Sequence, residues 1–173
     1  SNSYNGILQG NIFNKGYVAL ERTRNIQTLE NTFNAIYQQI TSSSNKIENN
    51  IFDAQLDPQL LRAGLIVSNF GHDNIIKNNI IDGRSDGVTA FKGTDDGIVI
   101  HESSGDIIEG NNIKNVWDCG IENTGTLSRT KIIGNNIKNA GVCGIGGWYW
   151  NSWIGNEVRD NIIDDSPSLL LIY

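Results

Sequence analysis

A three-part pattern of glycine, isoleucine and asparagine recurs along this chain at nearly constant spacing. It runs Gly-Ile, then Ile-Ile, then Asn-Ile, and it occupies residues 96–113, 119–137 and 143–162. The isoleucines that follow glycine in the three copies, Ile98, Ile121 and Ile145, are 23 and 24 residues apart. A repeat of this length is typical of a solenoid, in which each unit contacts only its neighbours.

The residue types of the repeat favour short strands joined by tight corners. The chain contains 26 Ile and 24 Asn, together with 19 Gly, 2 Pro and no Met. Isoleucine favours strands, whereas asparagine and glycine favour turns and left-handed backbone. We therefore predict an all-β parallel β-helix of about six to seven coils, with inward isoleucines in ladders and asparagines at the corners. A leucine-rich repeat is the weaker alternative, because it requires leucines and a helical return segment.

Two kinds of strand can be followed through the whole chain. We place the Gly-Ile strand at Val18, Ile36, Leu65, Ile98, Ile121, Ile145 and Leu170. We place the Asn-Ile strand at Asn11-Ile12, Asn31-Thr32, Asn50-Ile51, Asn79-Ile80, Asn112-Ile113, Asn136-Ile137 and Asn161-Ile162. The longest intervals fall in the first half. Surface loops are expected at Asp53–Arg62 and Gly83–Asp95, because the buried strands of each coil have a fixed length and extra residues have to lie outside them.

Charge and length limit the partners of such a domain. The net charge of the 173 residues is −6, and no cluster of lysine and arginine exceeds the pair Arg22 and Arg24. Nucleic acid would select the opposite sign, and no apolar run approaches the roughly 20 residues of a membrane span. We predict a single domain over residues 1–173 that neither binds nucleic acid nor inserts into a membrane.

Neither end of the predicted coil has a segment that could cover it. Ile7 and Leu8 begin within a coil, Leu169–Tyr173 form a strand, and the chain starts at Ser-Asn without an apolar signal region. Uncovered terminal rungs favour aggregation. We expect an excised or processed part of a longer protein, with flanking domains or other chains covering the ends.

Cys119 and Cys143 precede equivalent Gly-Ile pairs in neighbouring coils. If the coils stack at the usual strand spacing of about 4.8 Å, the two Cα atoms come within disulfide range. Parallel neighbours in register rarely direct their Cβ atoms suitably, so we expect stacked free thiols, with a disulfide as the alternative. A metal site is disfavoured because no histidine accompanies the pair.

The motif Gly-Ile-x-Ile followed by Ile-Ile-x-Gly-Asn-x-Ile resembles the repeat of the pectate-lyase-like superfamily of right-handed parallel β-helices. The resemblance runs from Gly6 to Tyr173. It implies a right-handed coil that acts mostly on polysaccharide, and we expect it to be extracellular or on the cell surface. The superfamily includes lyases, hydrolases, epimerases, phage tailspikes, adhesins and non-catalytic surface proteins, so the resemblance specifies fold rather than function.

The segment 146–153, Gly-Gly-Trp-Tyr-Trp-Asn-Ser-Trp, departs most from the repeat and holds three of the four tryptophans. In an extended segment Trp148 and Trp150 share one face. Exposed indoles on a rigid sheet suit the C–H face of a sugar ring. Loop packing and an assembly interface are the alternatives. Aligning the coils adds one more aromatic, and the predicted ligand-binding strip comprises Trp148, Tyr149, Trp150, Trp153 and Tyr173.

This strip leads to our main functional hypothesis, a non-catalytic adhesion module that binds cellulose or another plant cell-wall glucan without a cofactor. The negative net charge repels uronates, so an uncharged polymer is favoured. The combination of a β-helix with an aromatic patch resembles the tāpirins, cell-surface cellulose adhesins of thermophilic bacteria. A structural segment of a spike or surface layer is a further hypothesis.

Acidic residues support a different hypothesis, an enzyme acting on acidic polysaccharide as a lyase, hydrolase or epimerase. Glu122 is expected to face outward between Val99 and Gly146 in the stack. A lyase would add Ca²⁺ held by carboxylates and a basic residue. Asp95-Asp96 resembles in part the paired aspartates of the polygalacturonase-like hydrolases, although no Gly-His-Gly follows. The candidate catalytic residues are Glu122, Asp118, His101, Arg129 and Lys131.

Overall fold

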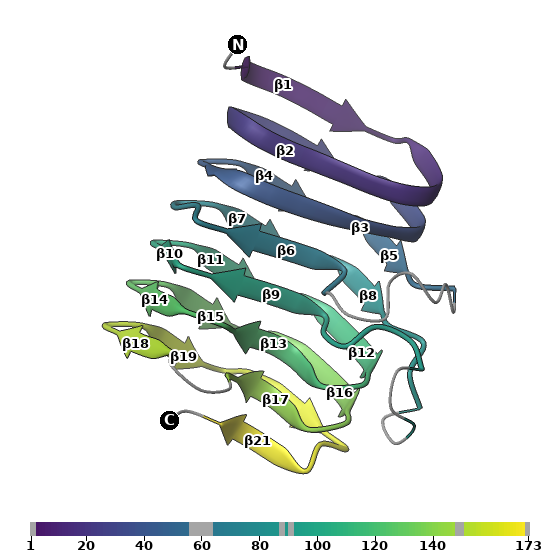
Figure 1. Cartoon of the computed structure of the whole chain (residues 1–173), viewed down its shortest axis with the longest axis vertical. Coiled ribbons are helices and arrows are strands. Elements are labelled where there is room, and N and C mark those ends of the chain that lie inside the picture. The colour runs from purple at the N-terminus through teal and green to yellow at the C-terminus, as the bar shows by residue number, and fades with distance from the viewer. Residues whose placement is uncertain (1–2, 56–63, 87–88, 90–91, 148–150, 172–173) are drawn as a thin grey trace.

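The computed structural model describes residues 3–55, 64–86, 89, 92–147 and 151–171. Its coils lie one above another along the longest axis, with the N-terminus at one end and the C-terminus at the other (Figure 1). The strand pairings between coils are parallel, as predicted. The described residues contain strands but no helix, and so no helix that could span a membrane.

The strands form four stacks, which we name A to D in the order in which the chain visits them; the three coils that begin at β9, β13 and β17 contribute to all four. Stack A holds β6 (Ile66–Asn69), β9 (Ile98–His101), β13 (Cys119–Asn123), β17 (Cys143–Gly146) and β21 (Ser168–Leu171). Stack B holds β10 (Ser103–Ser104), β14 (Thr126–Ser128) and β18 (Ser152–Ile154). Stack C holds β4 (Lys46–Glu48), β7 (Ile75–Lys77), β11 (Ile107–Glu109), β15 (Lys131–Ile133) and β19 (Glu157–Arg159). Stack D holds β5 (Ile51–Asp53), β8 (Ile80–Asp82), β12 (Asn112–Val116), β16 (Asn136–Ala140) and β20 (Ile162–Asp164).

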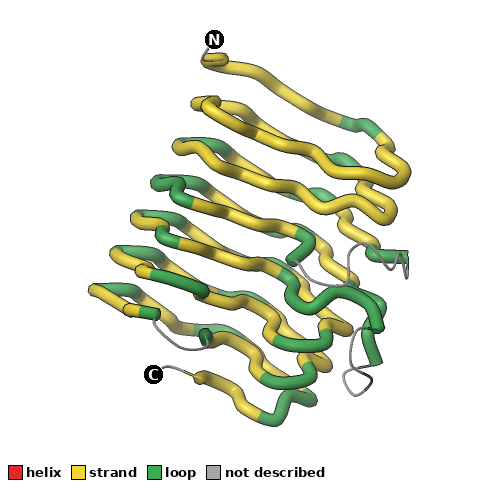
Figure 2. The backbone as a smooth tube through the Cα atoms, in the orientation of Figure 1, coloured by secondary structure: helices red, strands yellow, loops and turns green. Residues whose placement is uncertain are grey.

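Three long strands form the first coils. β1 (Ser3–Gln9), β2 (Ile12–Leu29) and β3 (Thr32–Ser43) follow the coil through its corners, so that β2 pairs with β1, β3 and β4. Figure 2 shows strand along most of these coils and more loop in the coils that follow. The predicted insertions lie where the chain passes from stack D to stack A, between β5 and β6 and between β8 and β9.

Inward side chains form the predicted ladders of the core. In stack C, Ile47, Ile76, Ile108 and Ile132 are fully buried, and each is the register partner of the next. The stack D ladder begins with the rings of Phe13, Phe33 and Phe52, whose centroids are 5.1 and 4.6 Å apart. It continues through Ile81, Ile113 and Ile137. Each buried isoleucine contributes roughly 1.5–3 kcal/mol.

The register of stack A in the early coils differs from the prediction. Val18 pairs with Gln38, and Gln38 pairs with Ile66, whereas Ile36 pairs with Gly16. The anchors placed at Ile36 and Leu65 are therefore wrong, by two residues and by one. The reason is that a polar residue occupies the inward position: Gln38 is fully buried, and its Nε2 donates a hydrogen bond to Thr28 Oγ1 over 3.1 Å.

An asparagine ladder runs along the corner between stacks C and D. At each step the backbone N–H of one asparagine donates to Oδ1 of the asparagine in the next coil, over 2.8–3.0 Å. The corner asparagines were predicted, but Asn112 and Asn136 were the wrong choices, because both are exposed on their strands. The ladder comprises Asn11, Asn31, Asn50, Asn79, Asn111, Asn135 and Asn161.

A second ladder, which the sequence analysis missed, follows the corner between stacks B and C. The backbone N–H of Asn45 donates to Asn74 Oδ1 over 3.0 Å, and that of Asn74 donates to Asp106 Oδ1 over 2.8 Å. Asp106 thus takes the place of an asparagine. Burial raises the pKa of Asp106, and hydrogen bonds from the Ser103 hydroxyl and the Asn74 N–H oppose the rise.

Candidate acidic site beside a disulfide

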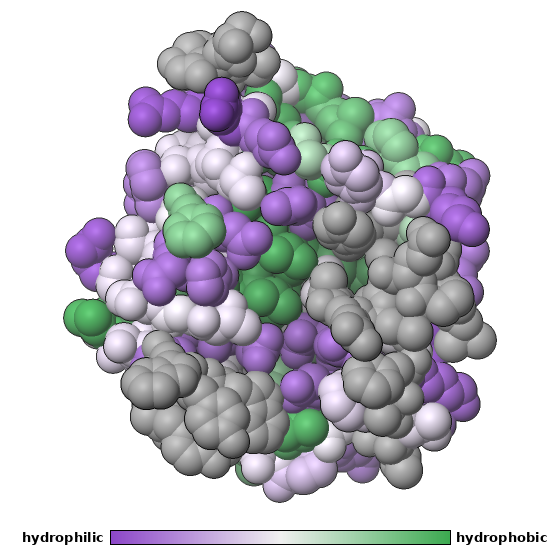
Figure 3. Space-filling model, viewed as in Figure 1, coloured by the Kyte–Doolittle hydropathy of each residue, from purple (hydrophilic) through white to green (hydrophobic). Residues whose placement is uncertain are grey.

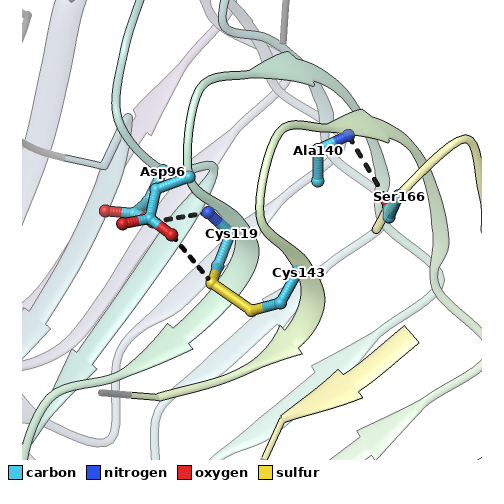
Figure 4. Close-up of a disulfide and its surroundings, with 6 residues drawn as sticks. Asp96, Cys119, Ala140, Cys143 and Ser166 are labelled. Atoms are coloured by element: carbon cyan, nitrogen blue, oxygen red, sulfur yellow. Dashed lines mark hydrogen bonds between the residues drawn. A yellow bond between two sulfur atoms is a disulfide. The ribbon is translucent and has the colours of Figure 1, made fainter. Parts of the chain in front are cut away.

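Four carboxyl groups gather where the chain enters stack A, and we name them the acidic cluster: Asp95, Asp96, Asp118 and Glu122. The stacking of coils brings them together, because the backbone N–H of Asp118 donates to Asp95 O over 2.7 Å. The N–H of Cys119 donates to Asp96 Oδ1 over 3.0 Å (Figure 4). Glu122 lies on β13 with Val99 and Gly146 as register partners, as predicted. Gly146 adds no side-chain contact to Glu122 on that side, although both residues are buried.

Two members of the cluster are held away from water. Asp96 is 5 % exposed and Glu122 is 8 % exposed. Burial raises the pKa of Asp96 well above its ordinary value, and the neighbouring Glu122 carboxyl adds to the rise. Burial also raises the pKa of Glu122 to about 7; Asp118 adds to this rise, and a hydrogen bond with Asp96 opposes it. A carboxyl group that holds its proton near neutral pH can serve as a general acid.

A disulfide joins Cys119 to Cys143 next to the acidic cluster (Figure 4). The two Cα atoms are 4.6 Å apart, and both residues are fully buried. The expectation of free thiols is wrong. Each cysteine is the first residue of its strand, β13 or β17, and therefore lies at the corner of the coil rather than in its straight part. Asp118 Oδ1 lies 3.2 Å from Cys119 Sγ, so the bridge also borders the cluster.

His101 lies on the same stack as Glu122. It follows Val99 by two residues on β9, which places it diagonally across from Glu122 on the outer face. Its Nδ1 lies 3.0 Å from Thr124 Oγ1 in the next coil. The ring of Phe70 meets the imidazole edge to face at 5.0 Å. His101 therefore borders the same surface without a contact to the cluster among the described residues.

Arg129 and Lys131 belong to other parts of the coil. Arg129 is exposed in the turn between β14 and β15, with φ of 51°. Lys131 lies on β15 in stack C, where its Nζ is 4.0 Å from Glu157 Oε2. The structure does not bring these two residues to Glu122. A lyase site in which they supply the base is not assembled by the described residues.

The predicted aromatic strip falls mostly outside the described residues, which exclude Trp148, Tyr149, Trp150 and Tyr173. The structure describes the residues at the two ends of this segment, Gly147 and Ser152. A Cβ on Gly147 would lie 2.1 Å from Asn123 O, so only glycine fits there. On the far side, the N–H of Ser152 donates to Gly125 O over 3.1 Å. Both ends thus rest on the coil that carries Glu122.

Trp153 packs inward. It is half-buried against the core, and its register partner on β14 is the fully buried Leu127. Its Nε1 donates to Asn151 Oδ1 over 3.2 Å. The prediction that Trp153 is an exposed member of the sugar-binding strip is therefore wrong, because its ring packs against the core.

Oxygen ligands for a divalent cation exist within the acidic cluster. Asp96 and Asp118 present carboxylate oxygens within 4.8 Å of each other. Carboxylate oxygens are the ligands that Ca²⁺ prefers. Cys119 is the third residue within that distance, but its sulfur is bonded to Cys143 and is not available as a ligand. The Ca²⁺ of the lyase hypothesis would be held by Asp96 and Asp118, and it stays a prediction.

The outer face of stack A combines apolar and polar side chains. Val67 and Val99 are half-buried register partners on β6 and β9, and Glu122 follows them in the same column. Figure 3, in the orientation of Figure 1, shows apolar side chains in the middle of this face with polar ones around them. Such a surface can contact the C–H face of a sugar while polar groups bind its hydroxyls.

A family model described as a right handed beta helix region matches residues 40–173, well over half of the chain. The chain belongs to the right-handed β-helix family. The β-helix is also similar to a crystal structure from Parabacteroides merdae ATCC 43184, described as a candidate glycosyl hydrolase. That match has 14% identity and a TM-score of 0.37, and it covers 92% of this chain and 80% of the other. No curated protein matches significantly. The family confirms the predicted fold and its handedness. Its description names no activity, so the function is argued from the site.

Asp96 is absent from the catalytic residues predicted from sequence. Its signal was available, because aligning the Gly-Ile pairs places Asp96 over Cys119 and Asp95 over Asp118. The sequence did not show that Asp96 would be buried or that Glu122 would share its environment. Both properties depend on how neighbouring coils close over the corner.

The raised pKa of Glu122 predicts a characteristic pH dependence of stability. The folded state holds this proton more tightly than the unfolded chain, so the stabilisation is fully present below about pH 4.5 and is lost as the pH rises through about 7. A pKa change from 4.5 to about 7 corresponds to about 3 kcal/mol. Urea unfolding between these limits should show this loss in the wild type. Glu122→Gln should lose less stability over this range than the wild type and keep only the part due to Asp96, whose pKa is also raised, whereas Glu109→Gln, on stack C, should follow the wild type. A Glu122→Gln profile parallel to the wild type would contradict the assignment.

Proposed function

We propose that this β-helix binds a polysaccharide along the outer face of stack A and hydrolyses its glycosidic bonds, with Glu122 as the proton donor. The observation that carries the proposal is the gathering of Glu122, Asp96 and Asp118 at one corner, with Asp96 and Glu122 buried; burial raises the pKa of Glu122 to about 7. Asp95 and Asp118 are half-buried and so partly reach solvent. Most glycosidases use two carboxyl groups, one as the acid and one as the base or nucleophile.

Each carboxyl group has a separate task in this proposal. Glu122 gives its proton to the glycosidic oxygen as the bond from that oxygen to the sugar carbon breaks. Asp118 accepts a proton from the water that attacks the sugar carbon. Asp96 orients the Glu122 carboxyl through their hydrogen bond, and its own high pKa keeps a second negative charge out of the site.

A neutral polymer, such as a plant cell-wall glucan, is the substrate that the surroundings favour. The chain carries a net charge of −6, which disfavours a uronate polymer at a site already built from carboxyl groups. The described residues on either side of segment 148–150 contact the coil that carries Glu122: Gly147 packs on Asn123, and Ser152 donates to Gly125 O. Aromatic rings can contact the C–H face of a sugar. The Cys119–Cys143 disulfide is of a kind that persists in oxidising compartments, which supports an extracellular or cell-surface location.

The test is release of reducing sugar from soluble β-glucans and cellulose oligosaccharides. Wild type should release sugar, and Glu122→Gln should lose about 10²–10⁴-fold in rate because its amide cannot donate the proton efficiently. Glu109→Gln is the matched control and should retain full activity. Equal rates for wild type and Glu122→Gln, or no product from any neutral or acidic polymer, would overturn the proposal. Unsaturated uronate products that require Ca²⁺ would instead support the lyase.

The second candidate function is the non-catalytic cellulose-binding module. It is favoured by the three consecutive aromatic residues at 148–150, whose described neighbours Gly147 and Ser152 contact the coil that carries Glu122. Wild type should be retained on insoluble cellulose, and the Trp148→Ala/Trp150→Ala variant should wash off. Tyr17→Ala, an exposed aromatic of the first coil, is the control and should be retained. Retention without sugar release would select this function, and full retention of the double variant would sink it.

A further inference from the structure

Phe70 lies on the surface directly after β6, in a backbone conformation that suits a large side chain poorly. Its side chain is 69 % exposed, and its φ is 52°. Positive φ is an outlier for a bulky residue. Among the described residues, the other non-glycine positions with positive φ hold polar residues, apart from Ala35. Residues strained in this way cluster at active sites and ligand-binding sites.

The neighbouring coils show that this corner does not require an aromatic residue. Asn69 is the register partner of His101, so Phe70 aligns with Glu102, whose φ is also positive at 47°. In the following coil Gly125 takes the same place, because a Cβ added to it would lie 3.0 Å from the backbone N of Glu102. A glutamate and a glycine thus occupy the corner that Phe70 occupies in its own coil. The exposed ring is a property of one coil and not of the repeat.

His101 contacts the ring of Phe70 and presents a hydrogen-bond acceptor beside it. The two rings meet edge to face, with centroids 5.0 Å apart. Thr124 Oγ1 donates to Ile100 O over 3.4 Å, so the same hydroxyl accepts from His101 Nδ1, which is 3.0 Å away. The carbonyl oxygen of Thr124, 3.2 Å from Nδ1, is also an acceptor. These partners hold the proton of the neutral imidazole on Nδ1. Nε2, which has no hydrogen-bond partner among the described residues, is left as an acceptor.

The pair has the groups that a neutral sugar ring requires. An exposed phenyl ring can contact the C–H groups of the sugar, and the Nε2 acceptor can bind one of its hydroxyls. The outward neighbours of the pair on stack A are uncharged, namely Asn69, Val99 and Thr124. The exposed carboxylate of Glu102, at the next corner, would repel a uronate. An uncharged sugar is therefore favoured here.

The pair lies on the same outer face as Glu122. β6, β9 and β13 follow one another in stack A (Figure 1), and Val99, two residues before His101, is the register partner of Glu122. Phe70 follows β6, two coils away from Glu122, which is roughly 10 Å along the axis at the usual strand spacing. That separation exceeds the length of one sugar unit. A sugar on Phe70 would therefore be at least one unit away from a sugar beside Glu122.

We propose that Phe70 and His101 form a subsite for one sugar residue of a neutral polysaccharide, remote from the bond that is cleaved beside Glu122. The inference rests on the proposed function, because it assigns the subsite and Glu122 to the same polymer. A long chain reaches both places, whereas a disaccharide beside Glu122 does not reach Phe70. The subsite therefore selects substrates by their length.

Calorimetric titration with a cellulose hexasaccharide, in the Glu122→Gln background, tests the subsite without turnover. Phe70→Asn removes the ring and supplies a residue that tolerates positive φ. It should weaken binding of the hexasaccharide by about tenfold. Phe70→Tyr keeps an aromatic ring and should bind like the parent. Tyr17→Ala removes an exposed aromatic of the first coil and should also bind like the parent.

Urea unfolding of the same variants separates sugar binding from a structural role of the ring. Phe70→Asn should be at least as stable as its parent, because asparagine adopts the left-handed backbone more readily. A lower unfolding midpoint for Phe70→Asn would show that the ring holds the coil together and would overturn the proposal. Equal hexasaccharide affinity in the parent and in Phe70→Asn would overturn it as well, and so would a parent that does not bind the hexasaccharide.

Kinetics with Glu122 in place distinguish this inference from the proposed function. Phe70→Asn should lower kcat/KM for the hexasaccharide about tenfold relative to kcat/KM for a disaccharide. If no variant hydrolyses any glucan but Phe70→Asn still loses hexasaccharide binding, the subsite stands and the catalytic role of Glu122 fails. If Glu122→Gln abolishes hydrolysis but Phe70→Asn leaves the preference for chain length unaltered, the catalytic role stands and the subsite fails.

Discussion

Replacing Asn111 with alanine is expected to lower the free energy of unfolding by about 3–5 kcal/mol. Asn111 is fully buried in the ladder between stacks C and D. Its Oδ1 accepts from both N and Nδ2 of Asn79, each over 3.0 Å, and its own Nδ2 donates to Ile76 O over 3.0 Å. Alanine would leave a buried N–H and a buried carbonyl without partners, and each costs about 1–3 kcal/mol.

Asn112 provides the matched control for this experiment. Asn112 lies between Asn111 and the core residue Ile113, and its side chain is exposed. Asn112→Ala should change stability by no more than about 0.5 kcal/mol. Urea unfolding followed by circular dichroism would measure both variants under the same conditions. Equal destabilisation by the two replacements would contradict the prediction. It would show that the buried hydrogen bonds of Asn111 contribute no more to stability than the exposed side chain of Asn112.

Removing the disulfide is expected to cost about 3.5 kcal/mol, the second largest effect on stability. Cys119 and Cys143 are 24 residues apart, and a closed loop of that length restricts the unfolded chain by about this amount at 25 °C. The variant Cys119→Ser/Cys143→Ser should therefore unfold at lower urea concentration than oxidised wild type.

Reducing agent gives the control for the disulfide. It should destabilise wild type towards the level of the double serine variant and should leave that variant unchanged. A wild type whose midpoint does not respond to complete reduction, verified by thiol titration, would contradict the assigned stabilisation. The loss should be one of stability alone, since the stacked hydrogen bonds of β13 and β17 remain.

The architecture could be predicted from sequence because its determinants are local and repeated. An inward isoleucine and a corner asparagine recur in each coil. A wrong assignment in one coil can therefore be recognised by comparison with the neighbouring coils. Register was harder to predict. In Asn111-Asn112-Ile113 either asparagine could occupy the corner, and only the burial of Asn111 distinguishes them. Gln38 was missed because a polar residue inside a coil looks like a loop residue until its partner Thr28 is known.

The site was predictable only in part, for a similar reason. The neighbours of Glu122 followed from aligning the coils. Its raised pKa depends on burial and on the nearby Asp118, and neither effect can be read from a local pattern. Arg129 and Lys131 are close to Glu122 in sequence, but the chain turns two corners between β13 and β15, so sequence proximity was misleading. The disulfide depended on Cβ directions at a corner, which spacing alone does not specify.

The asparagine ladder also has an electrostatic property. Its backbone N–H groups point towards the C-terminal end in every coil. The backbone carbonyls of the same asparagines point towards that end as well, because they accept hydrogen bonds from the following coil. An N–H and a carbonyl that point the same way have opposed dipoles, so the two sets offset each other along the axis, as in other β-sheets. Unlike an α-helix, this coil can therefore be extended repeat by repeat without building up a large dipole.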